Sequence, residues 1–169
     1  LNPRAYRQIL AVTFTNKAAK EMKERIELML GNCEARNLYI GTFHSVFSRI
    51  LRVEAERLGY PNNFTIYDTD DAKSVIKTIV KEKNLDDKTY KASIIYNRIS
   101  SAKNNLYSYR EYQADSDIQQ EDARSNRPLI GQTFEAYSKR CFKNGAMDFD
   151  DLLVNMYILL SNFPEALSK

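Results

Sequence analysis

A continuous apolar run that passes directly into a helical pattern constrains the fold of this chain more than any other feature. Residues 9–14 (ILAVTF) are almost all apolar or β-branched, as in a strand covered on both faces of a parallel sheet. In residues 17–30, apolar side chains recur every three or four positions as far as Met29, which predicts an amphipathic helix. Asn16 is the expected N-cap, and Gly31 is expected to end the helix.

The same order of strand, turn and helix follows directly. Residues 38–40 (LYI) predict a short strand and residues 41–42 (GT) a turn. A second apolar helical pattern begins near Phe43 or His44 and ends at Gly59. A strand–helix–strand unit with a helical crossover makes a parallel pair, which is almost always right-handed.

The rest of the chain predicts only helices. Helical patterns begin at Asp68 and at Asp86, and another occupies residues 128–143. Asp148 is expected to cap the last helix. Residues 103–126 are polar and only weakly periodic, so they predict a connection with at most a short helix.

The predicted fold class is therefore predominantly α-helical, with a small two-strand parallel α/β portion. Two parallel strands do not make a stable sheet on their own. The chain also begins with Leu1 rather than Met. We expect a piece of a larger α/β protein, with the missing strands upstream of residue 1 and downstream of residue 169.

Composition excludes several classes of protein. The 169 residues are 43% hydrophobic and 28% charged, unlike disordered or collagenous chains. The apolar runs are far shorter than the roughly 18 residues that a membrane span requires, and no secretory leader is recognisable. Cys33 and Cys141 lie far apart, without a metal-binding spacing. We expect no membrane association, no bound metal and a cytoplasmic location.

The net charge of +3 is unevenly distributed. Residues 1–58 hold ten Lys and Arg against six Asp and Glu, whereas residues 59–169 hold fifteen against sixteen. A basic excess in the first third is a mild indication of an anionic partner there. A solvated helix face explains most of these charges equally well.

Candidate binding residues follow the carboxyl ends of both predicted strands, where open parallel sheets bind ligands. Aromatic rings can stack on the bases of single-stranded nucleic acid, and hydroxyls and helix N-termini can hold phosphates. A buried core Phe and a structurally satisfied His are the competing interpretations for these positions. The candidates are Phe14, Thr15, Asn16 and Lys17 after the first strand, and Thr42, Phe43 and His44 after the second.

Four segments in order resemble the signatures of one family. Residues 11–26 (AVTFTNKAAKEMKERI) and 40–52 (IGTFHSVFSRILR) closely resemble motifs Ia and Ib of the UvrD/PcrA/Rep group of superfamily 1 DNA helicases. Residues 64–71 (FTIYDTDD) and 145–153 (GAMDFDDLL) resemble later signatures of that group. The resemblance spans nearly the whole chain.

The resemblance implies a parent protein that moves 3′ to 5′ along single-stranded DNA, driven by ATP and Mg²⁺. It implies that Phe14 stacks against a base and that Thr15 and Asn16 contact the strand. Thr42, Phe43 and His44 would hold the backbone or a nearby base. The expected partners are single-stranded DNA and the remaining helicase domains of the same parent; the oligomeric state is not defined.

The resemblance also divides the chain. Residues 1–64 would form part of the RecA-like domain 1A of a P-loop NTPase, and residues 65–147 a helical 1B-like insertion subdomain. Residues 148–169 would return to domain 1A. The sequence contains no G-x-x-x-x-G-K-[ST] phosphate loop, which the family places before residue 1. The metal-binding acidic strand would follow residue 169, so we expect no catalytic residue and no ATP or Mg²⁺ bound to this chain.

Other interpretations stay open. One is a non-catalytic helicase-like scaffold or an interaction module of a nuclease–helicase complex. Another is a metal nuclease using Asp148, Asp150 and Asp151, although an N-cap with first-turn acids is the favoured interpretation. Tyr96 and the tyrosines of residues 107–112 are a second candidate contact with DNA, with an ordinary surface favoured.

Overall fold

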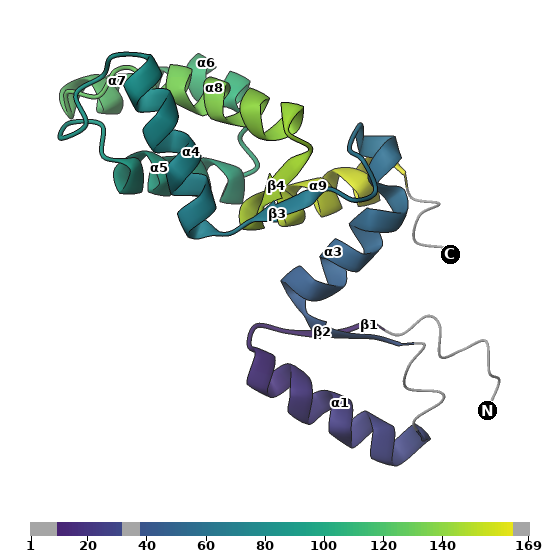
Figure 1. The fold of residues 1–169 in the computed structure, drawn as a ribbon. Coiled ribbons are helices and arrows are strands. Elements are labelled where there is room, and N and C mark those ends of the chain that lie inside the picture. Colours follow the sequence, from purple (N-terminus) through teal and green to yellow (C-terminus); the bar gives the residue numbers. More distant parts are fainter. Residues whose placement is uncertain (1–9, 32–37, 164–169) are drawn as a thin grey trace. The chain divides into compact units, whose positions relative to one another are not determined.

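The structure is a computed structural model that describes residues 10–31 and 38–163 (Figure 1). The chain divides into two compact units, residues 1–53 and 54–169. Among the described residues, no helix is both long and apolar enough to cross a bilayer. The strands are β1 (Leu10–Thr13), β2 (Tyr39–Thr42), β3 (Thr65–Tyr67) and β4 (Ala146–Asp148). The helices are α1 (Asn16–Leu30), α3 (Phe43–Glu54), the 3-10 helix η2 (Ala55–Leu58), α4 (Thr69–Glu82), α5 (Ala92–Asn104), α6 (Tyr109–Ala114), α7 (Ser116–Arg124), α8 (Ile130–Lys143) and α9 (Phe149–Asn162).

In the first unit, β1 and β2 form the predicted parallel pair. Leu10 lies opposite Tyr39, and the register continues to Thr13 opposite Thr42. The connection between the strands includes α1, which packs against both of them (Figure 1). Because β2 passes directly into α3, the turn predicted at residues 41–42 is instead the end of the strand.

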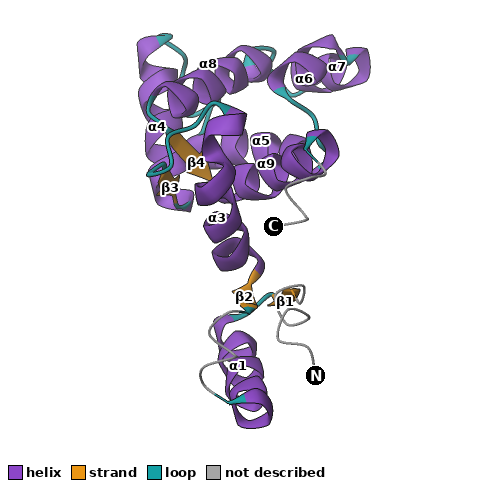
Figure 2. Cartoon of the chain, turned by 90° about the vertical axis from the view of Figure 1, so that its right-hand side faces the viewer, coloured by secondary structure: helices purple, strands orange, loops and turns teal. Residues whose placement is uncertain are grey.

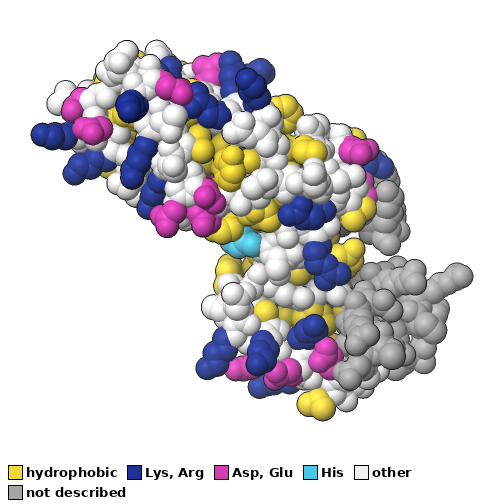
Figure 3. Space-filling view, in the orientation of Figure 1, with side chains coloured by type: hydrophobic (Ala, Val, Ile, Leu, Met, Phe, Trp, Pro, Cys, Tyr) yellow, Lys and Arg dark blue, Asp and Glu magenta, His cyan; other side chains and the backbone are white. Residues whose placement is uncertain are grey.

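Helix α1 differs from its prediction at both ends of its sequence pattern. Its N-cap is Thr15 rather than Asn16: the Thr15 hydroxyl accepts a hydrogen bond from the Ala18 N–H at 3.2 Å, while Asn16 is already helical. Met29, predicted to face inward, is 82% exposed, because the apolar contact of α1 ends before its last turn. Gly31 ends the helix as predicted, with φ 86°. Figure 3 shows Lys and Arg side chains interspersed with acidic ones over α1.

The second unit contains a second sheet that the sequence analysis did not predict. β3 and β4 pair in parallel, with Tyr67 opposite Asp148, so the expectation of helices only is wrong here. The two strands appear in orange among the helices in Figure 2. Because paired parallel strands need a crossover, the whole of residues 68–145, including α4 to α8, forms the connection between β3 and β4.

Two helix boundaries in this connection also differ from prediction. The helix expected from Asp86 begins only at Ala92, because Asp86 instead accepts hydrogen bonds from Thr89 in a preceding turn. The polar residues 103–126 are not a simple connection, since they form α6 and α7. Both helices begin at side-chain caps, Ser108 for α6 and Asp115 for α7. Caps rather than apolar periodicity specify these short helices.

The core of the second unit packs α4, α5, α6 and α8 together. One apolar face of each of these helices is buried, as the predicted periodicity of α4 and α8 requires, whereas Phe142 of α8 is 51% exposed. Asp68 caps α4 through a reciprocal capping box with Asp71. The largest buried members of the cluster are Ile76, Ile79, Ile95, Ile99, Ile130, Phe134 and Tyr137.

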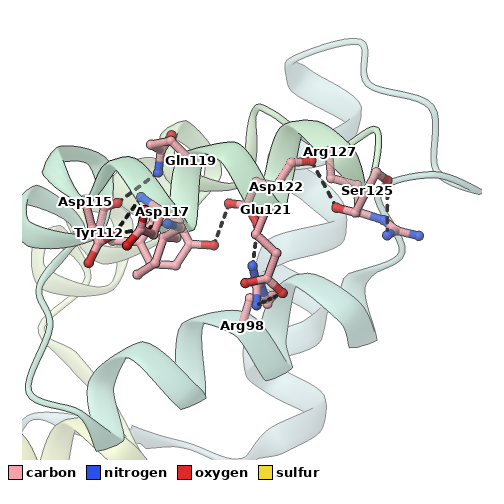
Figure 4. Close-up of polar contacts among 10 residues, drawn as sticks. Arg98, Tyr112, Asp115, Asp117, Gln119, Glu121, Asp122, Ser125 and Arg127 are labelled. Atoms are coloured by element: carbon pink, nitrogen blue, oxygen red, sulfur yellow. Dashed lines mark hydrogen bonds and ion pairs between the residues drawn. The ribbon is translucent and has the colours of Figure 1, made fainter.

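A buried carboxylate of α7 joins this helix to α5 and α6 (Figure 4). Asp122 of α7 is 0% exposed and accepts hydrogen bonds from Arg98 of α5 at 2.7 Å and from the Tyr112 hydroxyl of α6 at 2.6 Å. Arg98 also pairs with Glu121, whose side chain is 66% exposed. Both hydrogen bonds to Asp122 are charge-assisted and shielded from water, so this residue fixes how α5, α6 and α7 pack.

We predict that Asp122→Ala lowers the free energy of unfolding by about 2 to 4 kcal/mol, because Arg98 and Tyr112 lose their buried acceptor. The matched control is Glu121→Ala, which removes the exposed carboxylate from the same arginine and should leave stability close to the parent value. Urea unfolding followed by circular dichroism measures both. Equal losses for the two variants would contradict this assignment.

Candidate nucleic-acid interface

The carboxyl edge of the β1–β2 pair brings the two predicted clusters together. Thr13 lies opposite Thr42 in the parallel register. The residues that follow them, Phe14 and Phe43, therefore leave the sheet at the same edge. Their ring centroids are 5.1 Å apart with an interplanar angle of 45°. The parallel register therefore brings one aromatic residue from each predicted cluster to the same place.

Phe14 is not a core residue. Its side chain is 87% exposed, although Phe43 beside it is half-buried. An exposed aromatic ring at a strand end, resting against a second ring, has a free face on which a planar group can stack. The competing interpretation of Phe14 as a buried strand residue is therefore wrong.

Hydrogen bonds of the Thr42 and Ser45 hydroxyls stabilise the start of α3. The Ser45 N–H donates to the Thr42 hydroxyl at 3.3 Å, and the Ser45 hydroxyl donates to the Thr42 carbonyl at 2.9 Å. Gly41 allows this close approach, since a Cβ at that position would lie 2.6 Å from the Ser45 Oγ. The backbone that carries Phe43 and His44 is thus held in one conformation.

The other predicted residues lie at helix starts. Thr15 caps α1, and the Asn16 and Lys17 side chains are exposed in its first turn. His44 is exposed in the first turn of α3. Helix N-termini carry unsatisfied N–H groups and a partial positive charge, which favours anions. Contacts of these residues with DNA stay a prediction.

The sequence analysis missed one aromatic neighbour of this edge. Phe47 of α3 lies four residues after Phe43, and their centroids are 5.6 Å apart in an edge-to-face arrangement at 73°. The i,i+4 spacing is the signal that places the two rings together, but the same spacing is expected of any apolar helix face.

In the second unit, two of the three carboxylates of the alternative metal site, Asp148 and Asp151, are paired with one lysine. Asp148 caps α9 through a capping box with Asp151, as predicted. Lys103, almost completely buried, places its Nζ 2.7 Å from an oxygen of each carboxylate. The Tyr137 hydroxyl donates to Asp148 at 2.7 Å. Within residues 10–31 and 38–163, no group of His, Cys, Asp and Glu is placed to hold a metal ion.

These buried groups shift one another's ionisation. For Lys103, burial favours the neutral amine, but the two carboxylates outweigh it and raise the pKa above its ordinary range. For Asp148, burial is likewise outweighed by Lys103 and Tyr137, so its pKa is lowered. Burial raises the pKa of Asp151 to about 6, with Lys103 opposing the rise and Asp148 adding to it. One ammonium shared by two carboxylates is a structural cluster, which agrees with the favoured interpretation of Asp148 and Asp151 as cap residues.

The tyrosines considered as a second DNA contact have different environments. Tyr112 is 2% exposed and donates to Asp122, so its ring is a core element. Tyr107 is half-buried and donates to Asp115, and Tyr96 is half-buried with the Lys73 Nζ 5.7 Å from its ring centroid. The favoured interpretation of an ordinary structural surface agrees with these contacts.

Comparison with known proteins assigns the chain. The family described as the UvrD/REP helicase N-terminal domain matches residues 2–169. The chain belongs to this family. The strand-end residues Phe14 and Phe43 lie within the residues that this family matches.

The chain is similar to PcrA helicases of two staphylococci. An ATP-dependent DNA helicase PcrA of Staphylococcus epidermidis is 41% identical over 159 residues, which cover 94% of this chain and 21% of the relative. An ATP-dependent DNA helicase PcrA of Staphylococcus aureus is 39% identical over the same length. The chain therefore spans about a fifth of the length of these UvrD/REP relatives.

We predict that the Asp151 cluster makes stability depend on pH. Between about pH 4 and pH 6 the folded chain holds a proton on Asp151 that the unfolded chain, with the ordinary pKa of 3.8, has released. The contribution of Asp151 to the free energy of unfolding should therefore fall as pH rises through this window. Tyr60, Tyr137 and Cys141 beside the cluster stay neutral there, since burial raises the pKa of each.

Denaturant unfolding at pH values from 4 to 8 measures this slope. Asp151→Asn should flatten it, because asparagine cannot take up the proton. Asp150→Asn is the matched control on the same helical turn, where the carboxylate only accepts a hydrogen bond from Asn104 at the surface. An unchanged slope in Asp151→Asn would contradict the assignment.

Proposed function

We propose that this chain supplies part of the single-stranded DNA-binding site of an ATP-dependent DNA helicase. The observation that carries the proposal is the 87% exposed Phe14 ring, which rests against Phe43 at the carboxyl edge of a parallel strand pair. Base–aromatic stacking tolerates any sequence, since every base has a π face. Such stacking suits a protein that moves along DNA and binds it without sequence preference.

Polar groups at the same edge support the proposal. Thr15 and Thr42 place hydroxyls at the starts of α1 and α3, and both helices begin directly after the strands. Exposed N-terminal turns that carry Asn16, Lys17 and His44 add donors for phosphate oxygens. The edge thus combines a ring for bases with groups that favour the backbone.

We propose no site for ATP or Mg²⁺ within this chain. The sequence has no G-x-x-x-x-G-K-[ST] loop, and two carboxylates at the start of α9, Asp148 and Asp151, are paired with Lys103. We propose that the parent protein binds ATP and Mg²⁺ elsewhere and moves 3′ to 5′ along DNA in the cytoplasm. Residues 1–64 and 148–169 would belong to its domain 1A and residues 65–147 to a helical 1B subdomain.

The first test is fluorescence anisotropy of a labelled single-stranded oligonucleotide titrated with the 169-residue chain at two salt concentrations. We expect binding that prefers single strands over duplex and weakens with salt. Phe14→Ala should weaken binding by about tenfold or more, because a stacked base loses its platform. Leu28→Ala, which removes an equally exposed apolar side chain from α1, is the control and should bind as the parent does.

Equal binding by Phe14→Ala and Leu28→Ala would contradict the stacking role of Phe14. Absence of binding by the unsubstituted chain would favour the alternative of a helicase-like scaffold, in which these residues serve structure or protein contacts.

In the full-length parent, we predict that Phe14→Ala and His44→Ala each reduce the stimulation of ATP hydrolysis by single-stranded DNA. Loss of grip should leave the DNA-independent rate unchanged, since neither residue belongs to an ATP site. Steady-state ATPase assays with and without oligonucleotide measure the difference. Full stimulation in both variants would contradict a role for this edge in translocation.

A further inference from the structure

Phe14 lacks the surroundings that normally hold an aromatic ring still. With 87% of its side chain exposed, it has few neighbours to restrict its rotamers. A mobile ring loses conformational entropy each time a base stacks on it, which weakens binding. A stacking platform at this position therefore needs a support that fixes the ring without covering its free face.

A row of three rings provides such a support. Phe43 lies 5.1 Å from Phe14, tilted by 45°, and its other neighbour Phe47 lies 5.6 Å away, edge-on at 73°. Phe43 and Phe47 stand one turn apart on α3, so the helix itself sets their spacing. Phe47 is half-buried, which makes it the less mobile end of the row.

The start of α3 adds a second constraint. The hydrogen bonds between Thr42 and Ser45 fix the backbone on which Phe43 stands. Tilted and edge-to-face pairs are directional, because the positive ring edge is attracted to the negative ring face. The orientation of Phe47 is thus transmitted through Phe43 to Phe14.

We propose that Phe47 is a positioning residue for the single-stranded DNA site, acting through Phe43 to hold the Phe14 ring in the orientation that stacks on a base. The inference rests on the proposed function of Phe14. Phe47 itself does not contact the strand: it stands one helical turn beyond Phe43, at the opposite end of the row from Phe14.

The test uses the 169-residue chain and a single-stranded oligonucleotide that contains 2-aminopurine, whose fluorescence is quenched when a ring stacks on it. Phe47→Leu keeps an apolar side chain but removes the ring edge. Phe47→Tyr retains the ring. Phe142→Leu is the matched control, since Phe142 makes a comparable edge-on contact with Tyr60, 4.9 Å between centroids, in the second unit.

We expect Phe47→Leu to weaken binding about two- to tenfold, the range for one aromatic pair, and to reduce quenching even when the DNA is saturated. Saturated quenching reports how the ring stacks rather than how much protein is bound. Phe47→Tyr should restore both, and Phe142→Leu should change neither. Circular dichroism melting confirms that each variant is folded.

The outcomes separate the two proposals. Quenching by the parent chain together with unchanged saturated quenching in Phe47→Leu would overturn the positioning role and leave the proposed function standing. No quenching by the parent chain would overturn the stacking function of Phe14, and the inference about Phe47 with it.

Discussion

Parallel pairing of short strands is the constraint on which both units depend. A parallel pair cannot be closed by a tight turn, so each pair requires a crossover between its strands. In the first unit that crossover contains α1, and in the second it comprises residues 68–145 with their five helices. The helices of residues 68–145, the helical body of the second unit, are therefore not an addition at one end of the chain. The helical body is an expanded connection between two neighbouring strands, and its ends are held by the pairing of Tyr67 with Asp148.

The same constraint creates the candidate site. Parallel strands end at one edge, so the residues that follow β1 and β2 meet although they are far apart in sequence. In the proposed site, the aromatic residues there stack on bases and the helix starts hold phosphates. Membership of the UvrD/REP helicase N-terminal domain family agrees with a site of this chemistry. The rings of Phe14, Phe43 and Phe47 lie in a row, and in our proposal the third ring supports the exposed first one through the second.

Local signals predicted a large part of this fold, and non-local pairing accounts for most of what they missed. The apolar run ending at Phe14 predicts a strand because its residues are almost all apolar or β-branched, although Leu10 is 50% exposed in the structure. Asp148 is predicted as a cap from its own sequence neighbours. β3 and β4 have three residues each, too few for a period to be recognised, and their pairing depends on residues 68–145 folding between them. The shared edge of Phe14 and Phe43 followed from topology. The support from Phe47 did not, because a ring on an apolar helix stripe is equally expected to be ordinary core.

Lys103 connects the interior of the second unit's crossover to the point where the crossover ends. It belongs to α5, deep within the helical body, yet its ammonium binds the two carboxylates at the point where β4 becomes α9. The polypeptide enters and leaves the helical body through adjacent strands, and this single side chain ties the interior of the body to its exit. The connection between β3 and β4 is thus fastened at its exit by a side chain from its own interior, in addition to the pairing of the two strands.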